Sequence, residues 1–257
     1  LAQWILKQSI DRPKDDTDLV KKLLRFFGVG SYAGWTANFG SAQVAYRRSP
    51  AFEAAPESVT AWIRLGEIEA ERTVCKPFNK ARFKTVLAEV RSLTTKPFGE
   101  VHETLVDRCA AAGVVVALVR PLPKIRLSGI ARWIAKDKAL IQLSLRHKTG
   151  DHVWFSFFHE AGHILLHGKK AIFVDGKGED VTQLEHEANR FAADRLIPAA
   201  AFATFCEGGD FSAAAIKKFA SKQRVAPGIV VGRLQHTGAI LYSVHNDLKE
   251  WLDWADG

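Results

Sequence analysis

The amino-acid sequence predicts an α+β protein in which an all-helical N-terminal region precedes a second domain that combines helices with a small antiparallel sheet. Three observations predict this fold class. Residues 1–95 read as helices separated by turn-rich breaks, short apolar stretches typical of strands lie between residues 114 and 145, and two further helical patterns follow them. At 257 residues the chain is long enough for two such parts, which we place at 1–95 and 96–257.

The N-terminal region contains three helical patterns. Apolar residues recur at helical spacing over residues 17–27, which end before Gly28, and again over residues 56–72 and 78–93. We expect residues 39–55 to form a loop-like bridge between the first two of these helices.

The second part combines a helix with candidate strands. A helical pattern over residues 98–112 ends at Gly113. The apolar run at 114–119 then predicts a strand, and residues 129–135 and 139–145 predict two more strands that are joined by a short turn.

The segment from Asp151 to Gly168 contains the pattern H-E-x-x-H inside an apolar run that reads as one short helix. A helix turns about 100° per residue, so His159 and His163 lie about 40° apart on one face, one turn along. Two imidazoles in this arrangement can bind one Zn²⁺, with Glu160 beside them to handle the proton of a metal-bound water. The pattern is typical of metalloproteases, and its apolar surroundings predict a buried helix whose polar side chains need partners.

A catalytic zinc needs a third protein ligand and an open position for water. A third histidine six residues after His163 is absent, because that position is Lys169. His167 lies one turn beyond His163, but three ligands along one helix cannot surround a metal tetrahedrally. We therefore expect His167 to lie at the helix end, near the helix dipole, or to hydrogen-bond a metal ligand.

The third ligand is expected on a second helix that begins near residue 179 and stops at Pro198. Glu185 and Glu187 are about 200° apart on it, so only one of them can face the metal. Glu185 shares its face with small and apolar residues suited to close helix packing, whereas Glu187 is grouped with further charged residues. This grouping favours Glu185 and leaves Glu187 as the alternative. Asn189, one turn after Glu185, could hydrogen-bond a zinc-binding histidine.

These two helices resemble those of the ImmA/IrrE family of metallopeptidases, gluzincin-like enzymes of bacteria and their phages. The resemblance rests on HEAGHILLHG at 159–168 and EHEANRFAADRLIP at 185–198. The stretches LIQLSLRHKTGDHVWFSFFHEAGH and APGIVVGRLQHTG look like the branch of the family that is fused to an N-terminal Xre-type helix-turn-helix. LLRFFGV and AWIRLGEIEAE resemble the helical region that joins the two parts.

The resemblance implies a zincin-like fold of the gluzincin type for the second domain. One Zn²⁺ would be held by His159, His163 and Glu185, with Glu160 as the general base. In such folds the edge strand of the sheet lies above the metal and pairs with the substrate backbone. An oxyanion stabiliser is also expected. Its candidates lie near the helix that contains H-E-x-x-H, and they are Arg146, His147 and His152.

The resemblance also implies partners. The substrate would be a protein, typically a transcriptional repressor that is cleaved in a stress or mobile-element response. The alternative is an Xre-family regulator or an antitoxin of a toxin–antitoxin module, in which the metal domain acts as a sensor or a protein-binding platform. The first stretch that resembles the joining region begins at Leu23, with no recognisable helix-turn-helix before it. We therefore expect residues 1–95 to be the remnant of a longer regulator, in which DNA binding would depend on the missing helix-turn-helix.

The composition is that of a globular protein, with 47% hydrophobic and 25% charged residues. The net charge of +8 suggests an acidic partner. Three cysteines, an odd number placed far apart, form no disulfide framework and favour a reducing cytoplasm. No apolar run approaches about 18 residues and no signal peptide is recognisable, so we expect no membrane partner.

The chain opens on Leu1 and contains no methionine, which we interpret as truncation or as omission of modified methionines. The sequence makes no prediction of the oligomeric state.

Overall fold

The computed structural model describes residues 13–47, 56–122, 125, 127–167 and 179–253. Its helices are α2 (Asp16–Phe27), α3 (Tyr32–Arg47), α4 (Pro56–Arg72), α5 (Lys80–Leu93), α6 (Phe98–Ala110), α7 (Gly150–Leu166), α8 (Glu179–Leu196), α9 (Ala199–Glu207), α10 (Ala213–Gln223) and α11 (Pro227–His236). Its strands are β1 (Val114–Leu118), β2 (Gly129–Ala135) and β3 (Lys138–Leu143), and a short 3₁₀ helix, η2 (Asn246–Leu248), follows α11. The predicted α+β class is thus confirmed.

The three strands form a mixed sheet in the order β1–β3–β2. Strands β2 and β3 form the predicted antiparallel hairpin, whereas β1 pairs with β3 in parallel. The prediction of a purely antiparallel sheet is therefore wrong for β1. A hairpin fixes how its own two strands pair, but which of them lies beside a third strand depends on the tertiary packing.

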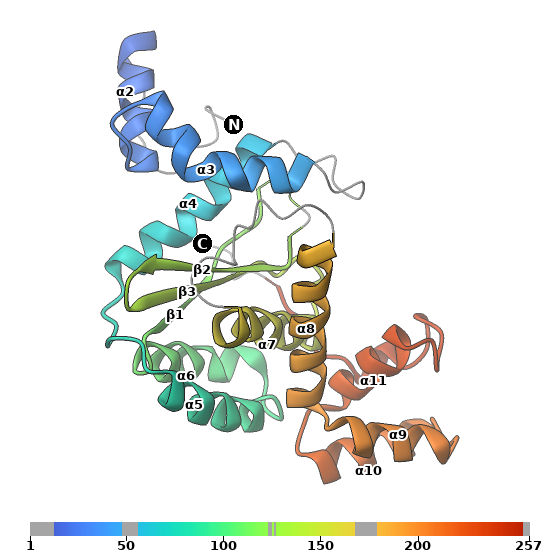
Figure 1. The fold of residues 1–257 in the computed structure, drawn as a ribbon. Helices are drawn as coiled ribbons and strands as arrows, with labels where there is room; N and C mark the ends of the chain where they lie inside the picture. Colours follow the sequence, from blue (N-terminus) through green and yellow to red (C-terminus); the bar gives the residue numbers. More distant parts are fainter. Residues whose placement is uncertain (1–12, 48–55, 123–124, 126, 168–178, 254–257) are drawn as a thin grey trace.

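Helices cover both faces of the sheet (Figure 1). Side chains alternate between the faces of a strand. On β1, Val115 and Ala117 belong to the hydrophobic cluster that contains Trp62 of α4, whereas Val114 and Val116 belong to the cluster shared with α6 and α7. Burial on both faces explains why β1 reads as an uninterrupted apolar run.

Helix α4 is tied to the sheet by polar contacts as well as by apolar packing. The amide of Gln142 on β3 donates to the carbonyl of Trp62 at 2.7 Å. Glu67 of α4 forms ion pairs with Arg64 and with Arg132 on β2, and all three side chains are largely buried. A helix of the N-terminal region thus packs on the sheet, while the division of the chain at residue 95 remains a prediction.

The predicted loop-like bridge at 39–55 is wrong over its first part, because α3 continues to Arg47. Residues 48–55 lie outside the described part of the chain. Phe39 is 2% exposed, and its ring lies 5.4 Å from that of Phe27 and 6.4 Å from that of Trp35. Tertiary packing of this kind supports helices whose local sequence carries little helical pattern.

Two arginines from outside α8 bind the backbone at its C-terminal end. Arg91 of α5 donates to the carbonyl of Leu196 at 3.0 Å, and Arg233 of α11 donates to the carbonyls of Ala193 and Ile197. The last carbonyls of a helix have no partner within it, so the bonds to the carbonyls of Leu196 and Ile197 satisfy groups that α8 itself leaves without one. Among the residues that the structure describes, no helix is both long and apolar enough to cross a membrane.

Candidate metal centre

Helix α7 carries His159 and His163 one turn apart, and α8 packs closely against α7. Gly162 lies between the two helices. A side chain at this position would meet the ring of Phe191 at 3.1 Å and the Cα of Ala188 at 3.3 Å. Glycine therefore lets the two helices approach, and this approach brings carboxylates of α8 within reach of the histidines of α7.

Three side chains converge at this contact. Nε2 of His159 lies 3.0 Å from Nε2 of His163, and the two nitrogens lie 3.2 and 3.3 Å from the carboxylate oxygens of Glu185. Zinc–ligand bonds of about 2.0–2.2 Å at tetrahedral angles place ligand atoms about 3.3 Å apart. The separations therefore suit one zinc-sized ion held by all three side chains.

The opposite nitrogen of each imidazole has a partner that fixes the tautomer. Nδ1 of His159 lies 2.9 Å from Oδ1 of Asn189, which can only accept, so Nδ1 donates and Nε2 keeps a lone pair. Nδ1 of His163 lies 2.9 Å from Nδ1 of His167, whose Nε2 faces the carboxylate of Glu187 at 3.3 Å. Because the carboxylate accepts from His167, Nδ1 of His167 accepts from His163, and Nε2 of His163 also keeps its lone pair.

The centre therefore gathers two nitrogen lone pairs and a carboxylate, a set that repels itself unless a cation lies between them. Two imidazoles and one carboxylate are also a donor set of catalytic zinc sites. By distance, tautomer and donor type, the described residues fit a bound Zn²⁺.

Glu160 lies beside the three converging side chains and is 7% exposed. Its carboxylate borders Gly129 at the start of β2, where an added Cβ would lie 2.9 Å from Oε1 of Glu160. Burial raises the pKa of Glu160 above its ordinary value. A carboxyl group with a raised pKa is suited to accept and return a proton.

The two glutamates of α8 that the sequence left as alternatives lie in different environments. Glu185 faces both metal-helix histidines, whereas Glu187 contacts His167 and accepts from Gln183 at 2.8 Å. The predicted contact between Asn189 and a histidine is present. His167 follows the last residue of α7 and hydrogen-bonds His163, which combines the two places expected for it.

The three candidates for an oxyanion stabiliser lie just before and within the start of α7. His152 borders the cavity next to the metal centre. Its Nδ1 lies 2.8 Å from Oγ1 of Thr149, and its ring stacks on that of His147 at 4.2 Å. The assignment of an oxyanion role among Arg146, His147 and His152 stays a prediction.

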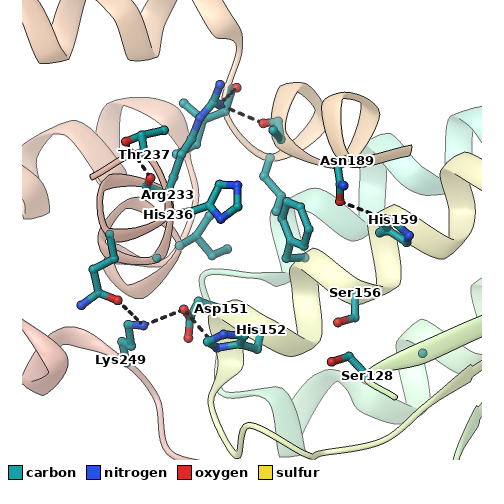
Figure 2. Close-up of a pocket in the computed structure, with 18 of the residues that line it drawn as sticks. Ser128, Asp151, His152, Ser156, His159, Asn189, Arg233, His236, Thr237 and Lys249 are labelled. Carbon is teal, nitrogen blue, oxygen red and sulfur yellow. Dashed lines mark hydrogen bonds and ion pairs between the residues drawn. The ribbon is translucent and has the colours of Figure 1, made fainter. Parts of the chain in front are cut away.

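A cavity of about 560 Å³ opens beside the metal centre, and His159 and Glu160 belong to its lining. Figure 2 shows Asp151, His152, Ser156 and His159 along α7, across the cavity from Arg233 and His236 of α11. Its far end contains a buried ion pair in which Nζ of Lys249 lies 2.9 Å from Oδ2 of Asp151.

Two parts of this centre were missed from the sequence. The contact of Glu187 with His167 was not predicted, although the four-residue spacing of His163 and His167 could have indicated a hydrogen bond between these histidines. Lys249 follows Asp151 by 98 residues in the sequence, so no local sequence pattern predicts the ion pair between them.

The comparison with protein families bears on the part of the chain that holds this centre. Residues 115–234 match the family model of Peptidase_M78, described as the IrrE N-terminal-like domain. They include nearly all of β1, the rest of the sheet, α7 and α8, and α11 up to Leu234. No curated protein matches the chain. The resemblance to the ImmA/IrrE family is thereby confirmed over residues 115–234: this part of the chain is an IrrE N-terminal-like domain of Peptidase_M78, a family of metallopeptidases.

Proposed function

We propose that the protein is a zinc-dependent endopeptidase that cleaves a regulatory protein, with His159, His163 and Glu185 as metal ligands and Glu160 as general base. The observation that carries this proposal is the convergence of two Nε2 lone pairs and one carboxylate, 3.0–3.3 Å apart, beside a buried glutamate. The family match supports a metallopeptidase in general.

A zinc ion bound there would polarise the scissile carbonyl and bring the pKa of a coordinated water to about 7. Glu160 takes the proton of the attacking water and passes it to the nitrogen of the leaving amine. Its position supports both transfers, because the buried carboxylate lies between the proposed metal ligands and Gly129 at the start of β2.

Strand β2 is the part of the sheet best placed to bind the substrate backbone. Within the described sheet it pairs with β3 alone, and it packs against α7. The first residue of β2, Gly129, borders Glu160. An extended substrate chain that adds to this edge would lie beside the general base, with main-chain hydrogen bonds to β2.

The substrate class follows from the resemblance to the ImmA/IrrE family. On that basis we propose a transcriptional repressor or another regulatory protein of a stress or mobile-element response. Cleavage of a protein chain agrees with the place of β2 at the edge of the described sheet, because an edge strand can pair with an extended segment through its backbone.

The experiment is a cleavage assay with a defined mixture of unstructured peptides, followed by mass spectrometry. Protein stripped by a chelator should be inactive and should recover on addition of one equivalent of Zn²⁺. Glu160→Gln should retain the metal and lose at least about 100-fold in rate, the usual contribution of a general base. The exposed Glu207→Gln on α9 serves as the matched control.

Two results would count against the proposal. Undiminished cleavage by zinc-loaded Glu160→Gln would remove Glu160 from the mechanism. A wild-type protein that binds one zinc and cleaves no peptide would instead favour a sensor or protein-binding platform.

A further inference from the structure

The cavity beside the metal centre extends along α7 toward its N-terminal end. Glu160 and His159 border it at the metal, Phe155 and Ser156 one turn earlier, and His152 one turn earlier still. Figure 2 shows His152, Ser156 and His159 of this row along a single helix face. If a peptide bond of the substrate is held at the metal, the side chain of a neighbouring substrate residue can therefore extend into this continuous cavity.

Apolar side chains from four parts of the chain form much of the wall. They come from the loop before β2, from α7, from the C-terminal half of α8 with the residue after it, and from the start of α11, and they are Leu127, Phe155, Ala193, Leu196, Ile197 and Ile229. Pockets that bind organic groups are of this kind, with volumes of about 300–1,000 Å³ and a mostly apolar lining.

Two of the charged side chains in the wall, those of Arg233 and Lys249, are already engaged within the protein. Arg233 donates to two carbonyls at the end of α8, and its guanidinium lies 4.2 Å from the centre of the Phe202 ring. Lys249 pairs with Asp151 and donates to Oε1 of Gln235 at 2.8 Å. A charged ligand group would have to compete for these partners at a desolvation cost, whereas an apolar group would not.

We propose that this cavity receives one large apolar side chain of the substrate, such as leucine, isoleucine or phenylalanine, from a residue that flanks the scissile bond. The inference rests on the proposed peptidase function and adds a substrate preference to it. Ala193 is the residue that keeps the space open, because it is the smallest of the apolar wall residues and lies one turn beyond Asn189 on α8.

The first test uses a peptide library in which the positions around the cut are randomised, digested by the zinc-loaded protein. One position adjacent to the cut should show leucine, isoleucine or phenylalanine at least about tenfold above aspartate and lysine, the range expected for apolar pockets. Ala193→Phe fills the cavity and should lower kcat/KM for these residues at least tenfold relative to alanine at the same position. Ala203→Phe, the same substitution at an exposed site on α9, should leave the preference unchanged.

The second test measures binding without cleavage, in Glu160→Gln protein with labelled methyl groups. N-acetyl-leucine methylamide should shift the methyl resonances of Ala193, Ile197 and Ile229, and N-acetyl-aspartate methylamide should not. Val20 and Val74 are exposed and lie outside the cavity, so they report non-specific binding.

The outcomes separate the two proposals. Cleavage without an apolar preference on either side of the cut would overturn the pocket assignment and leave the peptidase function intact. If no peptide is cleaved, the peptidase function fails, while the methyl titration still decides whether the cavity takes an apolar side chain. Equal shifts at Val20, Val74 and the cavity methyls would overturn the pocket assignment.

Discussion

His163 belongs to a chain of hydrogen bonds that ends on a carboxylate, through His167 to Glu187. The chain sets the tautomer of His163 and makes its Nε2 more basic, as a direct carboxylate partner does for many zinc-binding histidines. Here the imidazole of His167 stands between His163 on α7 and the carboxylate of Glu187 on α8, so the carboxylate acts on His163 through a second ring. The order of the chain requires Nδ1 of His167 to accept and its Nε2 to donate.

Replacing His167 by alanine should therefore weaken zinc binding about 10- to 100-fold, the usual effect of losing an outer hydrogen-bond partner of a ligand. His167→Asn should recover part of the affinity, because the side-chain oxygen of asparagine can accept from Nδ1 of His163. Zinc affinity is measured by competition with a chromophoric chelator. His186→Ala, at an exposed histidine of α8, is the control. Equal zinc affinity in His167→Ala and wild type would show that the hydrogen bonds from His163 through His167 to Glu187 do not affect zinc binding.

For individual residues, the sequence predicted correctly the features that depend on helical geometry alone. The spacing of His159 and His163, the two different faces of Glu185 and Glu187, and the position of Asn189 all follow from 100° per residue. The contact of Glu187 with His167 depends instead on how closely two helices approach, and that distance is set by tertiary packing.

The proposed metal centre depends on the distance between α7 and α8, because each helix supplies part of it. A Cβ added at Gly162 would lie 3.1–3.3 Å from the nearest atoms of α8. One of these atoms belongs to the backbone of Ala188, which cannot rotate away. Ala188 and Ala192 on the facing side of α8 are fully buried. A larger residue at Gly162 must push the helices apart and move Glu185 away from the histidines.

Gly162→Leu should thus lower the free energy of unfolding by about 1–3 kcal/mol, as overpacked cores do, and should also weaken zinc binding. The measurements are urea unfolding of the metal-free protein and a zinc titration. Gly99→Leu is the matched control, since a Cβ at this helical glycine of α6 meets no atom within 4 Å. A Gly162→Leu protein with wild-type stability and zinc affinity would contradict the packing argument.

Element by element, the sequence predicted the strands and the helices around the metal well, because their apolar patterns are strong. Strand β2 spans the predicted residues, and α4 was placed at Pro56–Arg72 as observed. The parallel pairing of β1 and the helical conformation of α3 could not be predicted, because both depend on contacts between segments far apart in the chain.

Across the whole molecule, the C-terminal segment returns to the start of α7. The backbone N–H of Gly150 donates to the carbonyl of Glu250 at 2.9 Å, and that of Leu252 donates to the carbonyl of Lys148 at 2.8 Å. The Asp151–Lys249 ion pair lies at the same junction, with both side chains 6% exposed. Residues after the family match thus support the helix that carries the two histidines of the proposed metal centre.

This ion pair predicts a pH dependence of stability. Burial alone would raise the pKa of Asp151, but its bonds with His152 and Lys249 lower it to about 2. Since the folded pKa lies below the ordinary value of 3.8, the stabilisation is complete above about pH 5 and is lost as the pH falls through 4 toward 2. The size of the lost contribution is on the order of 1 kcal/mol between pH 5 and pH 3.

The measurement is denaturant unfolding of metal-free wild type and Asp151→Asn from pH 6 to pH 3. Asp151→Asn should be less stable at pH 6, because Lys249 loses its buried partner. The difference between the two proteins should narrow below pH 4. A difference that stays constant over this range would show that Asp151 does not titrate as the ion pair requires.

The central claim is that one metal ion joins α7 to α8 through His159, His163 and Glu185, and a pair of variants on α8 tests it most directly. Zinc stoichiometry and affinity are measured for wild type, Glu185→Gln and Glu187→Gln. We predict one zinc per chain in wild type, a loss of more than about 100-fold in affinity for Glu185→Gln, and a loss of about tenfold at most for Glu187→Gln. If Glu185→Gln keeps one tightly bound zinc while Glu187→Gln loses it, the ligand assignment is wrong.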